Sequence, residues 1–214
     1  MIPLGDVDRR PARAPVVTRL VVLACVVVFA LEIDGGEDFV RRWSVIPSEV
    51  LAGRGVVTVL TSMFLHGGFG HIVGNLLFFW TFGPPIEGAM GHGRFLVFYV
   101  VGGLVAMLAQ VLADPGATTP LLGASGAIAA VMGAFLVTVP GDRIRTVLIF
   151  GFLVRVAFVP AIVLVGIWFL LQVLAEVGGA AGGVAYVAHI AGFVVGMGLA
   201  RPFEGRRAGE RRAG

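Results

Sequence analysis

Long apolar segments alternate with short polar ones along almost the whole chain. Six segments are apolar over about 20 residues, the length that an α-helix needs to cross a bilayer. They cover residues 16–33, 63–82, 95–113, 121–139, 157–175 and 184–200. The pattern predicts a helix at each segment, and therefore an all-α polytopic membrane protein folded as a six-transmembrane-helix bundle.

The remaining segments complete the predicted organisation. We expect residues 1–15 to form a cytoplasmic N-terminal segment, residues 16–200 the membrane domain, and residues 201–214 a basic cytoplasmic tail. The first span follows three arginines but no small-residue cleavage site comes after it, so we expect a retained span and not a signal peptide. The apolar stretch 147–154 is too short to cross, and we expect it to lie in the membrane interface or to lead into the fifth span.

Composition agrees with this class of protein. Of the 214 residues, 57% are hydrophobic and only 14% are charged. A soluble domain of this size cannot bury so much apolar surface. The composition therefore excludes a disordered chain, a soluble α/β enzyme and a nucleic-acid-binding domain, and it predicts an integral membrane protein. The single cysteine, Cys25, can form no internal disulfide.

The arginines set the expected orientation. All 16 basic residues are arginine, and the net charge is +3. If the N-terminus is inside, only Arg41, Arg42 and Arg54 of the 16 lie outside. The positive-inside rule then predicts that both termini are cytoplasmic. Separately, we expect the membrane to be the inner membrane of a bacterial cell. Contact with anionic lipid explains the net positive charge of the chain, so no nucleic-acid partner is needed to account for it.

Polar residues within apolar spans are costly in lipid and therefore point to function. His71 and Asn75 lie in the second span with His66 just ahead of them, Ser125 lies in the fourth span, and His189 in the sixth. These three spans all run from outside to inside. A rise of about 1.5 Å per residue places Ser125 and His189 roughly 6–8 Å below the outer ends of their spans. The polar residues are thus expected to share one layer.

Each of these residues taken alone also has a purely structural interpretation. A serine in a membrane helix commonly bonds the carbonyl one turn back, and an isolated histidine or asparagine can join two helices. Gln110 and Gln172 lie near helix ends and can reach interfacial water, so we assign them no role. The common depth of the other residues favours chemistry over these interpretations.

A serine hydroxyl becomes a nucleophile when a base within hydrogen-bond reach removes its proton, and Ser125 with His189 is the candidate pair. The spans contain no aspartate, so the pair would act as a dyad. Acyl transfer also needs donors for the developing oxyanion. The candidates for this oxyanion hole are the side chains of His71 and Asn75 and the backbone around Ser125 and Gly123.

Small residues predict that the fourth and sixth spans pack together. They form matching stripes, His189, Gly192 and Gly196 on the sixth span and Ser125, Ala129 and Gly133 on the fourth. Membrane helices approach most closely where such residues let their backbones meet. We therefore expect a bulky Gly192→Val to reduce activity more than Gly102→Val or Gly103→Val on the third span.

Four motifs occur together in this chain. They are Met63-Phe64-Leu65-His66-Gly67-Gly68, His71-x-x-x-Asn75, Gly123-Ala124-Ser125-Gly126, and Ala188-His189 followed by Gly192-x-x-x-Gly196. In combination they resemble the rhomboid family of intramembrane serine proteases, and the resemblance runs over residues 41–202. It implies Ser125 as nucleophile, His189 as general base, and His71 and Asn75 at the oxyanion hole, with neither metal nor other cofactor. The supporting positions that go with the resemblance are His66, Gly126, Gly192, Gly196 and Glu87.

The resemblance also implies features outside the motifs. Residues 34–60 would form an outer loop that dips partway into the membrane. Some members of the family place a tyrosine one turn after the nucleophile, stacked under the histidine. Here that position is Ala129, so His189 must be braced in another way.

The implied function is a serine endopeptidase that cleaves transmembrane segments of membrane proteins through an acyl-enzyme, with its active site open to the outer face. One alternative is a rhomboid-like pseudoenzyme that binds membrane proteins without cutting them, but such proteins normally lack the serine or the histidine. Another is a small six-helix transporter, which predicts inverted repeats and broken helices that the sequence does not show. A zinc protease is not indicated, since His-Glu-x-x-His is absent. The physiological substrate and the oligomeric state are not predicted.

Overall fold

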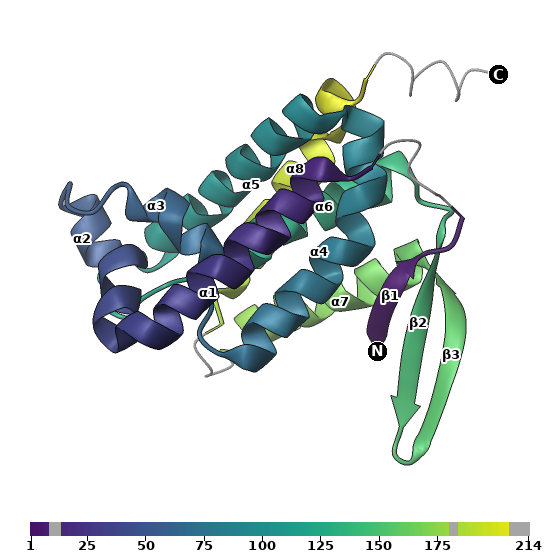
Figure 1. The fold of residues 1–214 in the computed structure, drawn as a ribbon, viewed down its shortest axis with the longest axis horizontal. Helices are drawn as coiled ribbons and strands as arrows, with labels where there is room; N and C mark the ends of the chain where they lie inside the picture. Colours follow the sequence, from purple (N-terminus) through teal and green to yellow (C-terminus); the bar gives the residue numbers. More distant parts are fainter. Residues whose placement is uncertain (9–13, 180–183, 206–214) are drawn as a thin grey trace.

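The computed structural model describes residues 1–8, 14–179 and 184–205, which form a bundle of apolar helices with a small sheet at one end (Figure 1). The first helices are α1 (Val16–Trp43), α2 (Pro47–Leu51), α3 (Thr58–Thr61) and α4 (Phe69–Met90), with a 3-10 turn at Ser62–Phe64. The later helices are α5 (His92–Ala113), α6 (Ser125–Thr138), α7 (Ala161–Val177) and α8 (Tyr186–Phe203).

The helices fit the predicted class of membrane protein. Among the described helices, α1, α5 and α8 are apolar and long enough to cross a bilayer, and α6 and α7 are shorter apolar helices. The count of six spanning helices stays a prediction. Three predicted spans begin at least four residues late. The helix predicted at 63–82 starts only at Phe69, the one at 121–139 at Ser125, and the one at 157–175 at Ala161.

A three-stranded antiparallel sheet contradicts the all-α expectation. Its strands are β1 (Ile2–Asp6), β2 (Arg143–Phe150) and β3 (Leu153–Pro160), in the order β1-β2-β3. The stretch 147–154 is therefore the tip of a β-hairpin, whose second strand leads into α7, the helix of the fifth predicted span. Gly151 forms the turn with a φ of +58°, which is the left-handed conformation that glycine favours in tight hairpins. β-Branched and aromatic side chains on both sides of this turn favour strands over a helix.

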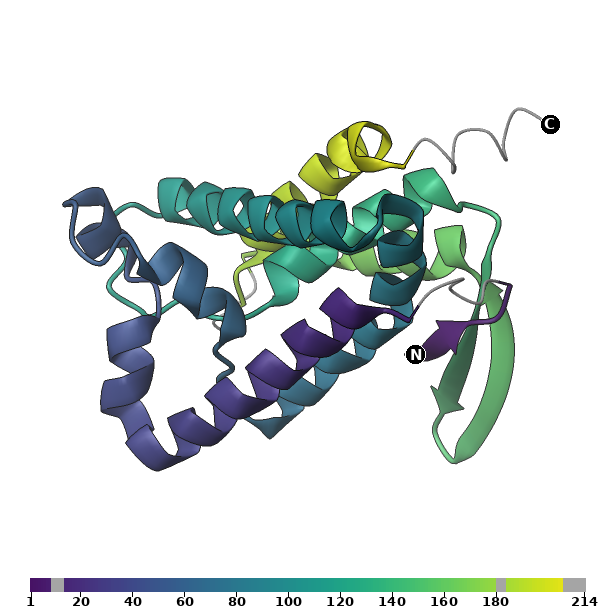
Figure 2. The same cartoon turned by 45° about the horizontal axis from the view of Figure 1, so that its top comes forward.

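The central helix of the bundle is α6. Figures 1 and 2 show it enclosed by its neighbours, and α4, α5 and α8 all contact it. Its buried side chains lie on every side of the helix, as expected for a helix that is apolar all round. Phe135 of α6 packs edge-on against Phe82 of α4, with ring centroids 5.1 Å apart. The first residue of this buried helix is Ser125.

The chain turns sharply within α1. Gly36 has a φ of +61° and a ψ of −155°, which breaks the helix close to the end of the predicted span 16–33. Figure 2 shows the rest of α1 running back toward α2 and α3, which contact α5. This segment covers the residues 34–60 that were expected to form a loop, and its place on the outer side of the membrane stays a prediction.

Glu87 joins the beginning of α1 to the last turn of α4. Its buried carboxylate accepts hydrogen bonds from the backbone N–H groups of Val17 and Thr18, both at 2.8 Å, and from the Thr18 hydroxyl at 2.7 Å. Nδ1 of His92, the first residue of α5, lies 2.6 Å from the same carboxylate. Because the first N–H groups of a helix have no intrahelical acceptor, Glu87 serves as a distant cap for α1.

Candidate active site

Ser125 and His189 come from different helices and are in hydrogen-bond contact. Ser125 is the first residue of α6, and His189 lies in the first turn of α8. The Oγ atom of Ser125 is 2.7 Å from Nε2 of His189. The serine and the histidine that the sequence placed in one layer are thus brought together.

Glycines allow this contact because, without side chains, they let the backbone of α8 lie directly against the backbone of α6. A Cβ atom on Gly192 would overlap the carbonyl oxygen of Gly126, and one on Gly196 would overlap that of Ala130. The predicted packing of the fourth span against the sixth is therefore confirmed, and these glycines set the distance between the two helices.

Gly102 and Gly103, where a bulky residue is expected to cost less activity than at Gly192, also have close neighbours. A Cβ atom on Gly102 would lie 2.6 Å from that of Ala130, and one on Gly103 would overlap the side chain of Met63. Both glycines of α5 face the central helix, but a side chain there would meet side-chain atoms, whereas at Gly192 it would meet the backbone of α6. Substitutions there are unsuitable as controls for Gly192.

The N-terminus of α6 lies at the serine itself. The sequence placed Ser125 four residues into a helix, where its N–H would bond a carbonyl one turn back. Because the helix starts at Ser125, the N–H groups of its first turn lack intrahelical acceptors, and no side chain caps them. The positive end of the helix dipole therefore points at the space next to the Ser125 hydroxyl, where it favours negative charge.

His71 faces the same space from α4. Its Nδ1 accepts a hydrogen bond from the Gly67 N–H at 3.2 Å, so a neutral ring carries its proton on Nε2. A Cβ atom on Gly123 would lie 3.0 Å from that Nε2 and 3.6 Å from the Ser125 hydroxyl. Gly123 has a φ of +132° and donates its own N–H to the Ser62 carbonyl at 2.9 Å. It therefore provides room at the site, while its N–H is already occupied.

Asn75 and His66 support this side of the site. Asn75 is buried one turn after His71 and donates an amide hydrogen to the His71 carbonyl at 3.0 Å. The buried ring of His66 meets the His71 ring edge-on, with centroids 5.3 Å apart. The backbone N–H of His66 donates to the buried carboxylate of Glu32 at 2.9 Å. The position of the His71 ring is thus fixed by contacts from both sides.

Two glutamines to which the sequence assigned no role hold the beginning of α8. Oε1 of Gln172 lies 2.7 Å from Nδ1 of His189, and Oε1 of Gln110 accepts the N–H of Ala188 at 3.2 Å. The sequence did contain an indication of these roles, because each glutamine lies three residues before the predicted outer end of a span, in the same layer as Ser125. We expected these glutamines to bond to water at the helix ends. The structure shows that this interpretation is wrong, since both bond to protein groups.

A cavity of about 620 Å³ opens onto this group of residues. Its polar lining consists of His71, Asn75, Ser125 and His189, and its walls include Phe78, Leu121, Ile128, Met132 and Trp168. The walls come from α4, α6, α7 and α8 and from the segment before α6. A mostly apolar cavity with a few convergent polar groups is the usual form of a binding or catalytic site.

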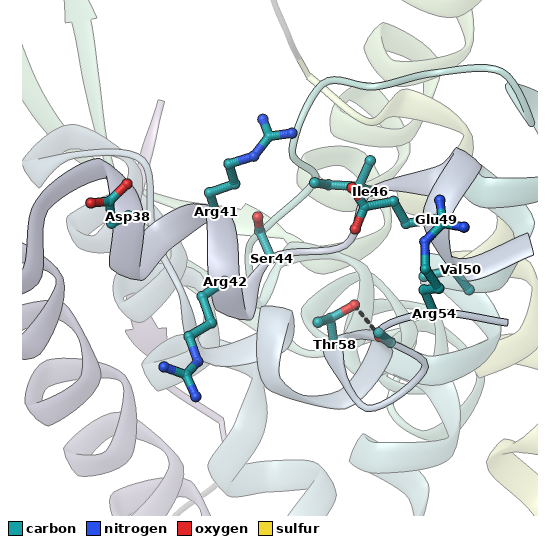
Figure 3. Close-up of a pocket in the computed structure, with 10 residues that line it drawn as sticks. Asp38, Arg41, Arg42, Ser44, Ile46, Glu49, Val50, Arg54 and Thr58 are labelled. Atoms are coloured by element: carbon teal, nitrogen blue, oxygen red, sulfur yellow. Dashed lines mark hydrogen bonds between the residues drawn. The ribbon is translucent and has the colours of Figure 1, made fainter. Parts of the chain in front are cut away.

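A second cavity, of about 310 Å³, lies among the end of α1, α2 and α3. Arg41, Arg42 and Arg54, the arginines predicted to lie outside, all line it. Figure 3 shows Arg41 and Arg42 pointing in opposite directions, so their guanidinium groups do not converge on one point. The polar groups that could carry out acyl transfer are gathered in the larger cavity.

Fold and site together define an integral membrane protein in which a serine–histidine pair lies inside a bundle of apolar helices. The sequence profile of the Rhomboid domain matches residues 53–204, well over half of the chain. The chain therefore belongs to the rhomboid family.

Curated relatives agree with the family match. Rhomboid protease GlpG of Salmonella paratyphi A is 31% identical over 197 residues, which cover 88% of this chain and 63% of that protein. Rhomboid protease GluP of Bacillus subtilis is 31% identical over 126 residues, covering 58% of this chain and 24% of that protein. Rhomboid protease GlpG of Salmonella typhi is 33% identical over 122 residues, which cover 56% of this chain and 43% of that protein. The chain thus spans from about a quarter to under two thirds of these relatives.

Proposed function

We propose that this protein is an intramembrane serine endopeptidase that cleaves transmembrane segments of other membrane proteins with a Ser125–His189 dyad. The observation that carries the proposal is the 2.7 Å contact between Ser125 Oγ and His189 Nε2 beside the larger cavity. The printed names of the relatives, which are rhomboid proteases, support the same chemistry.

The first half of the reaction forms an acyl-enzyme. His189 Nε2 takes the proton of the Ser125 hydroxyl while Oγ bonds to the carbonyl carbon of the scissile peptide. The carbonyl oxygen becomes an oxyanion and receives hydrogen bonds from the Ser125 N–H, from His71 Nε2–H and from the amide of Asn75. When the tetrahedral intermediate collapses, the C–N bond breaks and the histidine returns its proton to the leaving amine.

The second half releases the other product. A water molecule gives a proton to His189 and attacks the ester carbonyl, and the same donors hold the new oxyanion. Cleavage of the C–O bond returns the proton to Ser125. Both halves require a neutral histidine, so we expect activity to fall on acidification.

The substrate helix has to open before it can be cut. A helical segment keeps its carbonyls in backbone hydrogen bonds, which are strongest in lipid. The 14 residues of α6 span about 21 Å, less than the roughly 30 Å of a hydrocarbon core, so with its other end at the inner surface the Ser125 end would lie below the outer surface. We therefore expect a single-span substrate cut near its outer boundary, after a small residue, with Gly or Pro nearby to ease unwinding.

The orientation that goes with this function has both termini in the cytoplasm and the active site open to the outer face of a bacterial inner membrane. The distribution of arginines supports it, since most of them lie on the predicted inner side. The proposed partners are transmembrane protein substrates and membrane lipid. The residues of the dyad and oxyanion hole suffice for the chemistry without a metal ion.

A fluorophosphonate probe separates this proposal from the pseudoenzyme and the transporter. Detergent-purified protein should be labelled, with the adduct mapped to Ser125 by mass spectrometry. His189→Ala should label far more slowly, because the hydroxyl loses its base. Absence of labelling in folded wild-type protein, or an adduct elsewhere that is insensitive to His189→Ala, would contradict the proposal.

A further inference from the structure

We propose that Gln172 is the positioning residue of the catalytic histidine, an inference that rests on the proposed function. The two ring nitrogens of His189 have different partners, Ser125 Oγ at Nε2 and Gln172 Oε1 at Nδ1, each at 2.7 Å. A base that accepts the serine proton needs an unprotonated Nε2, so the neutral ring must carry its hydrogen on Nδ1. The amide oxygen of Gln172 is the acceptor for that hydrogen.

A second contact fixes the direction of the Gln172 amide. Its Nε2 donates to the backbone carbonyl of Trp168, one turn earlier on α7, at 3.4 Å. A carbonyl can only accept a hydrogen bond, so the NH₂ group must face Trp168 and the amide oxygen must face His189. The Trp168 ring also lies beside the histidine ring, with centroids 5.8 Å apart.

A glutamine suits this environment better than a carboxylate would. It selects the required tautomer without bringing a negative charge into an apolar bundle, where an ionised group is costly. It also supplies the brace that Ala129 cannot give from α6. Because Gln172 belongs to α7, the base is oriented only while α7 lies against α8.

Two variants and a control test this role in proteoliposomes with a transmembrane reporter substrate. Gln172→Leu keeps the approximate size and removes the acceptor, and we expect kcat to fall roughly 10- to 100-fold with little change in KM. Gln172→Glu keeps an acceptor and adds charge, so the acid limb of its kcat–pH profile should move to higher pH, because a carboxylate favours the imidazolium. The control is Leu171→Ala, which changes a neighbouring exposed side chain of α7. It should leave kcat and the kcat–pH profile unchanged.

A readout independent of proteolysis is the ¹⁵N spectrum of histidine-labelled protein in micelles at neutral pH. Wild type should show His189 protonated at Nδ1 only, and Gln172→Leu should show a mixture of tautomers. If cleavage survives Ser125→Ala, the proposed function fails. If cleavage depends on Ser125 but Gln172→Leu changes neither the tautomer nor kcat, only the role of Gln172 is refuted.

An independent feature is the outward face of the β2–β3 hairpin, which is apolar although it belongs to no helix of the bundle. The exposed apolar side chains of the hairpin are Ile149, Phe152, Leu153, Val154, Val156 and Phe158. The register pairs Ile149 with Val154 and Arg145 with Phe158, which places these four on one face. Ile144, on the opposite face, is fully buried.

Positive charge borders this apolar face. β2 and β3 contain three arginines and no acidic residue. Arg143 is paired with Asp8 at 2.8 Å, and the hydrogen bonds and charge of Asp8 raise the pKa of Arg143 above its ordinary value. Arg145 lies on the apolar face itself, and Arg155, paired with Leu148, lies near the tip on the opposite face; both are exposed.

We infer that this face lies in the headgroup layer of an anionic lipid leaflet. β3 leads directly into α7 and β2 follows shortly after α6, so the hairpin stays at the boundary of the bundle. β3 is an edge strand with unpaired backbone groups, which the hydrocarbon core cannot satisfy but the headgroup layer can. Apolar side chains next to arginines match such a layer.

The test uses Phe152→Cys in a Cys25→Ala background, labelled with an environment-sensitive dye and placed in nanodiscs. With phosphatidylglycerol present, emission should shift to the blue and be quenched by lipids carrying a nitroxide near the headgroup. Arg145→Gln with Arg155→Gln should weaken this effect in anionic discs but not in purely zwitterionic ones. Emission equal to that in water, with no quenching by the nitroxide lipids, would overturn the inference.

Discussion

His71 and Asn75 lie one turn apart on α4, and both line the cavity next to Ser125. Their neighbours define how each can act. His71 presents Nε2–H because Nδ1 is occupied by the Gly67 N–H, and Asn75 has one amide hydrogen left after bonding the His71 carbonyl. At the scale of single residues, the proposed oxyanion hole therefore depends on donors that surrounding hydrogen bonds hold in place.

We expect Asn75→Ala to lower kcat by about 10- to 1,000-fold, the range for one lost oxyanion donor, with KM nearly unchanged. His71→Ala should behave similarly. Steady-state cleavage of a transmembrane reporter checks both, and Val73→Ala, at an exposed position of the same helix, is the matched control. Unchanged turnover in Asn75→Ala would remove this residue from the site.

The close spacing of α6 and α8 is a property of the helices that depends on a few glycines. Gly192→Ala adds a single methyl group that would overlap the Gly126 carbonyl, so α8 has to move away from α6. Because about 1 Å of misplacement can cost roughly a hundredfold in rate, we expect a loss of that order. The measurement is kcat together with thermal unfolding in the same detergent.

Gly198→Ala is the control for this change on the same helix. A Cβ atom at Gly198 meets no atom within 4 Å, so activity should be unaltered. Helix propensity alone favours alanine over glycine by about 1 kcal/mol, so this variant should not lose stability. A fully active Gly192→Ala would show that backbone contact between α6 and α8 does not set the catalytic distance.

The cap that Glu87 provides for α1 predicts an effect on stability. Glu87→Gln replaces an oxygen acceptor by an NH₂ group that faces the donors of Val17 and Thr18, and we expect a loss of about 1–3 kcal/mol in the free energy of unfolding. Thermal unfolding checks this, with Glu176→Gln at the exposed end of α7 as control. Equal unfolding temperatures in the two variants would argue against the cap.

Part of the fold and site was predictable from the sequence because polar residues are conspicuous in apolar spans. Ser125, His189, His71 and Asn75 occur in predicted helices at similar depth, and the structure brings them to one cavity. Gln172 was not predictable in the same way, since an amide near a helix end has water as an alternative partner. Only the position of α7 against α8 shows that it faces the histidine.

The hairpin was missed for a related reason. Nearly every residue of 143–160 is apolar or arginine, so the alternation of a half-buried strand is weak. Strand pairing with β1 depends on contacts between residues far apart in the chain. The starting point of α6 at Ser125 likewise follows from tertiary contacts, since the apolar pattern itself continues back to Leu121.

At the scale of the whole molecule, the bundle places a short buried helix so that its N-terminus, a hydroxyl and an imidazole meet at one cavity. α5 and α8 pack against this helix through glycines, and α4 supplies the side chains opposite the serine. We propose that the protein hydrolyses peptide bonds inside the membrane at this site.

The most direct test is cleavage of a single-span reporter by purified protein reconstituted in liposomes. Wild type should cut the reporter. Ser125→Ala and His189→Ala should each abolish cleavage while unfolding at the wild-type temperature. The double variant should be no worse than either single variant, because the two residues act as a unit. Cleavage at the wild-type rate by folded Ser125→Ala would contradict the claim.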